Sequence, residues 1–167
     1  MLNVKPLIQD EYGEDNDCTL VSILTILNHR IGNLDLNYWY SIIERVAKRY
    51  FYSGKNGTLP FFINSIMKRV TPECNPHVRY LKNIGFNFNT IRRQLDQGNP
   101  VIISMMNDGR NVYKNHSIVV IGYNVYKIDN RNIRMLAVYD NWSREVRYID
   151  YERLSMISSI NYYAPVA

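Results

Sequence analysis

Cysteine is scarce in this chain, since Cys18 and Cys74 are the only two among 167 residues. Two cysteines allow one intramolecular disulfide at most, so the sequence lacks the disulfide framework on which very small secreted domains depend. We expect both thiols to be reduced. Long apolar runs are lacking as well, because the longest one lies around Val119 to Gly122 and is far too short to cross a bilayer. The sequence therefore predicts no membrane span.

Charge of one sign is not concentrated anywhere in the chain. The 20 lysines and arginines exceed the 15 acidic residues, but they are scattered in the way that is typical of solvated helix surfaces. We therefore expect no nucleic-acid partner. The N-terminus also lacks a basic region followed by an apolar run, which predicts a cytoplasmic protein, or a secreted one if a leader has been removed.

The composition is that of an ordinary globular protein, with 46% apolar and 21% charged residues. No internal repeat or low-complexity segment interrupts it, and the length suits a single domain that spans residues 1–167. The sequence leaves the oligomeric state open.

Helical patterns fill the first half. Apolar side chains are so dense from Cys18 to His29 that this segment is predicted to be a buried helix, and the two residues before it, Asn16 and Asp17, are good capping types. Turn residues such as Gly98 separate the later helices. The further helices are predicted at Leu36 to Tyr50, Leu59 to Val70 and Thr90 to Gln97.

Segments rich in valine, isoleucine and tyrosine follow, separated by asparagine, aspartate and glycine turns. They predict antiparallel strands at Val101 to Met105, Ser117 to Val125, Ile133 to Tyr139, Glu145 to Tyr148 and Ile157 to Tyr163, with a loop or short strand earlier, at Cys74 to Tyr80. The fold class is therefore α+β, with a helical N-terminal half packed on an antiparallel C-terminal sheet.

Cys18 is the candidate nucleophile, because the start of a helix and a nearby imidazole both lower the pKa of a thiol. Of the three histidines, His29 lies on the same helix and cannot fold back, and His77 lies in the surroundings of the proline-flanked loop Pro72 to Pro76. His116 opens a rigid apolar strand, as a general base requires. Asp140 ends the next strand, so a hairpin would bring it beside His116 as the hydrogen-bond acceptor of the imidazole, and the neighbouring Asn141 could serve instead.

An attacked carbonyl also needs donors for its oxyanion. Gln9 lies upstream of Cys18, and its side-chain amide together with the backbone N–H of Cys18 is the predicted pair of donors. The predicted site contains no metal, and the protein requires no cofactor. The predicted partner is a peptide or protein substrate.

Three segments together resemble papain-like cysteine peptidases, and most of all the bacterial C39-like peptidases. They are Leu7 to Gln9 with Asn16-Asp17-Cys18, then Ile91 to Ile103 with its Gly98-Asn99-Pro100 turn, and His116 to Tyr123 with Val138 to Trp142. The resemblance implies a papain-like fold and a cysteine peptidase that acts through Cys18, His116 and Asp140. The chain differs from the family by Thr19, which stands where a glycine is usual, and by the longer loop between Gln9 and Cys18.

Three functions are compatible with this pattern. The first is hydrolysis of a peptide or isopeptide bond through an acyl-enzyme. The second is acyl transfer on the same residues, as in transglutaminase-like proteins. The third is a binding module that keeps the scaffold without catalysis, in which Cys18 would be a small buried hydrophobe. Trp142 is expected to cover the contact between His116 and Asp140 or to belong to the core.

Overall fold

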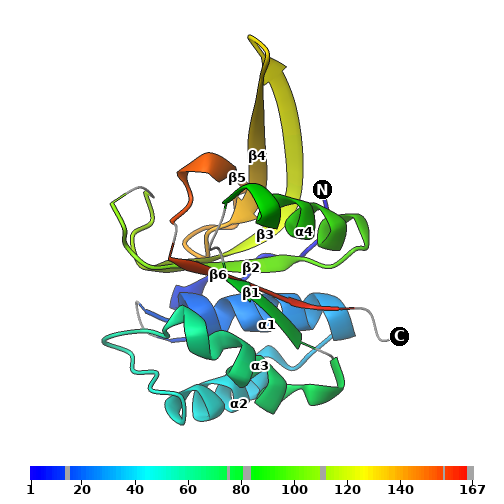
Figure 1. Ribbon diagram of the computed structural model, residues 1–167. Coiled ribbons are helices and arrows are strands. Elements are labelled where there is room, and N and C mark those ends of the chain that lie inside the picture. Colours follow the sequence, from blue (N-terminus) through cyan, green and yellow to red (C-terminus); the bar gives the residue numbers. More distant parts are fainter. Residues whose placement is uncertain (14–15, 75, 81–83, 110–111, 156, 165–167) are drawn as a thin grey trace.

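Helices and strands of the computed structural model follow the predicted order, with helices first and most strands afterwards (Figure 1). The structure describes residues 1–13, 16–74, 76–80, 84–109, 112–155 and 157–164. The helices are α1 (Cys18–Ile31), α2 (Leu36–Lys48), α3 (Ile63–Val70) and α4 (Ile84–Asp96). The strands are β1 (Pro76–Tyr80), β2 (Val101–Met105), β3 (His116–Ile128), β4 (Arg131–Tyr139), β5 (Arg147–Asp150) and β6 (Ser158–Tyr163).

The six strands form one sheet in the order β1-β6-β2-β3-β4-β5, and every neighbouring pair is antiparallel. The predicted hairpin of β3 and β4 is confirmed, with Val119 opposite Tyr139 near one end and Ile128 opposite Arg131 at the other. Its far end projects beyond the rest of the molecule (Figure 1). The near end brings the first residue of β3 close to the last residue of β4.

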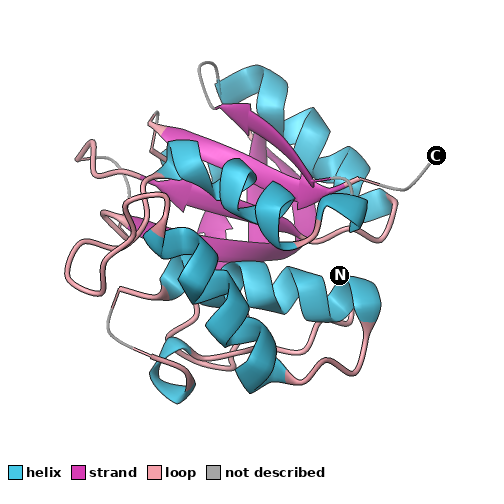
Figure 2. Cartoon of the chain, turned by 90° about the horizontal axis from the view of Figure 1, so that it is seen from below, coloured by secondary structure: helices cyan, strands magenta, loops and turns pink. Residues whose placement is uncertain are grey.

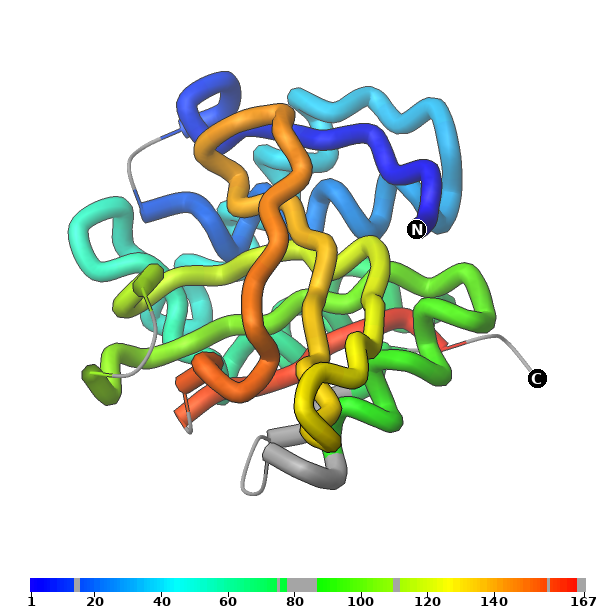
Figure 3. Tube along the Cα trace, turned by 90° about the horizontal axis from the view of Figure 1, so that it is seen from above, coloured from blue at the N-terminus to red at the C-terminus, as the bar shows by residue number. Residues whose placement is uncertain are grey.

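Helices cover both faces of the sheet. The face seen in Figure 2 carries α1, α2 and α3, whereas α4 lies on the opposite face (Figures 1 and 3). The alternation of side chains along β2 explains this arrangement: Ile102 belongs to the core under α1 to α3, while Val101 and Ile103 belong to the core under α4. Strand β2 is apolar on both faces because it is covered on both.

Most predicted elements are confirmed with shifted ends. The helix expected at Thr90 to Gln97 begins earlier, at Ile84, and ends before Gly98, whose φ of 82° is the left-handed conformation that glycine adopts readily. The helix expected from Leu59 begins with a 3-10 turn at Pro60–Phe62 and becomes α-helical at Ile63. The segment predicted as a loop or short strand contains β1.

Candidate active site

Cys18 is the first residue of α1, and its side chain is half-buried. The predicted capping of this helix by side chains is wrong, because Asp17 at the N-cap makes no side-chain capping hydrogen bond. The amide of Asn16 instead donates to the backbone carbonyls of Gly54 and Lys55, at 2.8 and 3.0 Å. Asn16 therefore fastens the loop after α2 to the segment that carries the cysteine.

The carboxylate of Asp17 accepts hydrogen bonds from the hydroxyls of Tyr40 and Tyr52. Asp17 is 1% exposed, and a buried carboxylate needs such donors because it has lost its hydration. The two tyrosines therefore turn Asp17 away from capping and anchor the start of α1 to α2 and the loop that follows α2. The first-turn N–H groups of α1 consequently receive no cap from this side chain.

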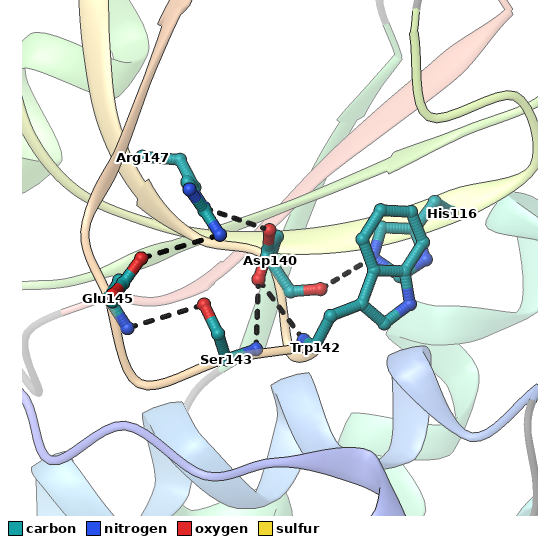
Figure 4. Close-up of polar contacts among 6 residues, drawn as sticks. All are labelled: His116, Asp140, Trp142, Ser143, Glu145 and Arg147. Carbon is teal, nitrogen blue, oxygen red and sulfur yellow. Dashed lines mark hydrogen bonds and ion pairs between the residues drawn. The ribbon is translucent and has the colours of Figure 1, made fainter.

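The imidazole of His116 has a defined tautomer. Its Nε2 lies 2.6 Å from the backbone carbonyl oxygen of Asp140 (Figure 4). A carbonyl oxygen only accepts hydrogen bonds, so Nε2 carries the proton and Nδ1 is the basic nitrogen of the neutral ring. Pairing of β3 with β4 creates this contact, as the sequence predicts, but it is the backbone of Asp140 that accepts.

The carboxylate of Asp140 is occupied by the turn that follows β4. Its Oδ1 accepts from the backbone N–H groups of Trp142 at 3.1 Å and Ser143 at 3.3 Å. Its Oδ2 lies 3.6 Å from Nε of Arg147, which also pairs with Glu145 (Figure 4). The side chain of Asp140 thus shapes the loop that presents Trp142.

Two aromatic rings enclose the imidazole. Tyr113 stacks on His116 with ring centroids 5.4 Å apart, and Trp142 lies against it with centroids 4.3 Å apart. Trp142 is 51% exposed, so it forms a lid over His116, which confirms the expectation for this residue. Tyr113 was not anticipated, because no sequence pattern links it to the histidine that follows three residues later.

Asn141, the predicted alternative acceptor, serves another purpose in this arrangement. Its Nδ2 donates to the backbone carbonyls of Cys18 at 3.1 Å and Ser117 at 2.8 Å, and to Oγ of Ser22 at 2.8 Å. The residue is fully buried and has a φ of 63°. Asn141 therefore joins the cysteine helix to the histidine strand.

Cys18 and His116 line one cleft of about 270 Å³ between α1, β2, β3 and the loop after α2. Oxygen and nitrogen atoms of the side chains and backbone mix with apolar groups on its walls. The other lining residues are Asn16, Thr19, Lys55 to Pro60, Ser104 to Met106, Asn115 and Ser117. Folding therefore brings a thiol near the N-terminus and an imidazole near residue 116 to the same cavity.

Burial favours the neutral forms of both groups. It raises the pKa of the Cys18 thiol, and hydrogen bonds with Ser117 and Thr19 act in the opposite direction. Burial also lowers the pKa of His116, while the hydrogen bond to the Asp140 carbonyl and the negative charge of Asp140 raise it. Burial in this cleft therefore disfavours both the thiolate and the imidazolium.

Gln9 is 4% exposed and begins a 3-10 turn at Gln9–Glu11. Its backbone N–H donates to the carbonyl of Asn141 at 2.9 Å, which places it beside the loop that follows β4. Among the described residues, those lining the cleft do not include Gln9 or Asp140.

The remaining histidines and the second cysteine lie elsewhere. His29 borders a separate hollow at the far end of α1, where its Nε2 donates to the carbonyl of Gly98 at 3.1 Å. His77 is exposed on β1 and stacks on Tyr162. Cys74 is buried in a 3-10 turn. Of the three histidines, His116 is the one that shares a cavity with Cys18.

The arrangement of a cysteine at a helix start and a histidine that opens a strand of an antiparallel sheet defines the class of papain-like cysteine peptidases. A family model described as the Peptidase_C39 like family matches residues 1–164, and the chain belongs to this family. Family and fold together indicate cysteine peptidase activity.

Among solved structures, the chain is similar to the peptidase domain of Streptococcus ComA, a bi-functional ABC transporter involved in a quorum sensing pathway. The identity is 18% and the TM-score is 0.53, with 99% of this chain and 100% of that chain covered, so the likeness concerns the fold. A comparison with curated protein sequences gives no match. Within the described ranges, no helix is long and apolar enough to span a bilayer, and no group of three or more metal-binding side chains is found.

Proposed function

We propose that the protein is a cysteine peptidase that hydrolyses a peptide or isopeptide bond of a peptide or protein substrate through Cys18, His116 and Asp140. One observation carries this proposal: Cys18 and His116 line the same cleft, and the hydrogen bond from Nε2 to the Asp140 carbonyl leaves Nδ1 as the base. A base with a fixed tautomer is ready to accept the proton of a thiol.

In the proposed first half-reaction, Nδ1 of His116 takes the thiol proton and Sγ of Cys18 bonds to the substrate carbonyl carbon. The oxyanion that forms is stabilised by the backbone N–H of Cys18, and the side-chain amide of Gln9, which is not among the residues lining the cleft, stays the predicted second donor. The absence of a side-chain cap from Asp17 supports a role for the first of these donors. When the tetrahedral intermediate collapses, the imidazolium protonates the departing amine, and a thioester to Cys18 remains.

In the second half-reaction, a water molecule attacks the thioester while His116 accepts its proton. The carbon–sulfur bond breaks, and the imidazolium returns the proton to the sulfur. The carbonyl of Asp140 holds the ring throughout, since it accepts from Nε2 in both the neutral and the protonated imidazole. Trp142 packs against the imidazole that makes this hydrogen bond.

Alkylation by iodoacetamide, located by mass spectrometry, tests the nucleophile without knowledge of the substrate. Alkylation of Cys18 at neutral pH is expected to depend on His116 and to be slower in His116→Gln. Turnover of a peptide library should vanish in Cys18→Ala and persist in the matched control Cys74→Ala. Undiminished library cleavage by Cys18→Ala would contradict the proposal.

A binding module without catalysis is the second candidate, and burial of Cys18 favours it, because burial raises the pKa of the thiol. A thiol that titrates at or above the value of a free cysteine and is insensitive to His116→Gln would support this candidate. A thiol whose alkylation slows in His116→Gln would support the peptidase.

A further inference from the structure

Three buried hydroxyl groups form a chain beside the thiol of Cys18. Oγ1 of Thr19 lies 2.6 Å from Oγ of Ser117, and Oγ of Ser117 donates to Oγ of Ser104 at 2.9 Å. The three residues come from α1, β3 and β2, and none is more than 2% exposed. All of them line the cleft that contains Cys18 and His116.

The hydrogen bonds along this series of three hydroxyls can point in either of two directions, because each hydroxyl has a single proton to donate. Because Ser117 donates to Ser104, Ser117 accepts in its bond with Thr19, and the third proton remains at the Ser104 end. No hydrogen bond between described residues uses that proton. If all three groups rotate, Ser104 donates to Ser117, Ser117 donates to Thr19, and the third proton lies at the Thr19 end, beside the sulfur.

We propose that this chain of hydroxyls reverses direction when Cys18 ionises, so that Thr19 donates a hydrogen bond to the thiolate. The inference rests on the proposed function, in which Cys18 is the nucleophile. During ionisation the S–H bond breaks and the proton goes to Nδ1 of His116. The three hydroxyl groups only rotate about their C–O bonds, and no O–H bond breaks.

The buried position of the thiol explains why such a device is needed. Burial penalises the thiolate and raises the pKa of Cys18, and the hydrogen bonds that oppose this effect come from Ser117 and Thr19. A linked series of hydroxyls is polarised along its length, so the far group strengthens the near one. Ser104 therefore acts on the sulfur through Ser117 and Thr19, as a positioning residue.

The titratable groups near the thiol must stay the same when the chain of hydroxyls is tested by mutation. They are His116 on β3, Lys55 on the loop after α2, and Asp17, whose carboxylate is bound by Tyr40 and Tyr52. None of them is changed by substitutions in the hydroxyl groups. Differences in thiol titration between such variants therefore report on the hydroxyls.

The experiment measures the rate of iodoacetamide alkylation at Cys18 as a function of pH in the full chain. Thr19→Val removes the hydroxyl and keeps the branched shape, and it is expected to lower the thiolate fraction at neutral pH about tenfold, as for the loss of one hydrogen bond to a charged group. Ser104→Ala should lower it about threefold. Thr19→Ser should restore the titration of the native protein.

Thr25→Val is the matched control. Thr25 lies on the same helix, is equally buried, and donates to the carbonyl of Val21 within that helix, so its removal should leave the Cys18 titration unchanged. The conservative Thr19→Ser variant and the distant Ser104→Ala variant keep the test decisive if Thr19→Val does not fold.

An unchanged thiol titration in Thr19→Val and Ser104→Ala would overturn the hydroxyl chain while leaving the proposed function intact, because alkylation would still depend on His116. A change in Thr19→Val with none in Ser104→Ala would reduce the effect to one hydrogen bond and also overturn it. If the alkylation rate of Cys18 is the same in the native protein and in His116→Gln, the proposed function is refuted, and the inference with it.

Discussion

Nε2 of His116 donates to the backbone carbonyl of Asp140, and the carboxylate of the same Asp140 points into the turn that follows β4. The orientation of the base is thus provided by the position of a strand end, and the side chain of Asp140 contributes by shaping the loop (Figure 4). The backbone remains when the side chain is changed, which makes the two contributions separable by mutation.

Replacement of the Asp140 carboxylate by an amide should have a small effect on catalysis. Where a carboxylate itself sets the histidine tautomer, its loss costs about 10⁴-fold in rate. Here the carbonyl sets the tautomer, and the Oδ1 of asparagine can still accept from the turn, so Asp140→Asn should keep cleavage of a peptide library within about tenfold of the native rate. Asp140→Ala, which also loses the turn contacts, is the comparison variant. Abolition of cleavage by Asp140→Asn would mean that the carboxylate moves onto the imidazole.

Asn141→Ala should strongly destabilise the fold. The substitution removes the amide that bonds to Cys18, Ser22 and Ser117 and leaves buried acceptors without a donor, at about 1–3 kcal/mol for each such group. The positive φ of Asn141 adds about 1 kcal/mol of strain for alanine. The free energy of unfolding in urea measures the total. Asn141→Gly relieves the backbone strain but does not restore the hydrogen bonds. It should therefore recover only the smaller part of the free energy of unfolding that Asn141→Ala loses.

Tyr52→Phe should weaken the anchor at the start of α1. The phenol donates to the buried carboxylate of Asp17, and a hydrogen bond to a charged group contributes about 1.5–3 kcal/mol. The expected loss in the free energy of unfolding lies in this range. Tyr50→Phe, two residues earlier on a half-buried side chain, is the control and should cost less than about 0.5 kcal/mol, the usual effect of a change away from such contacts. Equal losses in the two variants would argue against the anchor.

The stability of the protein should fall towards acid partly because of His116. Burial lowers the pKa of His116 below its ordinary value of 6.5, so the unfolded chain binds more protons than the folded one as the pH drops through and below 6.5. The contribution of His116 to the free energy of unfolding is therefore fully present above that pH, and it decreases as the pH falls towards the pKa of the folded state. Urea unfolding of the native protein and His116→Gln at several pH values measures the difference. The difference in the free energy of unfolding between the two proteins should become smaller in acid.

The Cys18 thiol should lower the stability of the protein in alkaline solution. Burial raises the pKa of Cys18 above 9.0, so the folded chain retains a proton that the unfolded chain releases, and stability declines as the pH rises through 9.0. Cys18→Ala should remove this part of the decline. If the native protein and Cys18→Ala lose stability in parallel above that pH, the thiol is not penalised by burial.

The order of elements and the two candidate residues that line the cleft, Cys18 and His116, could be predicted from local patterns. Dense apolar residues predicted α1, segments rich in valine, isoleucine and tyrosine predicted β2 to β4, and a helix start and a strand start marked Cys18 and His116. A hairpin alone was enough to bring Asp140 near His116. These features follow from periodicity and from antiparallel pairing, which act over short stretches of chain and are therefore written in the sequence.

The tertiary structure decided which atoms and partners are used. Asp17 suits a helix cap, but two tyrosines reach it from α2 and the loop beyond, and a buried carboxylate takes the donors that surround it. Asn141 could have faced the imidazole, yet the backbone of its loop directs its amide to α1. The placement of α4 on the opposite face and the meeting of Thr19, Ser117 and Ser104 likewise depend on how distant segments pack. Contacts of this kind are set by the positions of whole elements in space, which no local pattern encodes.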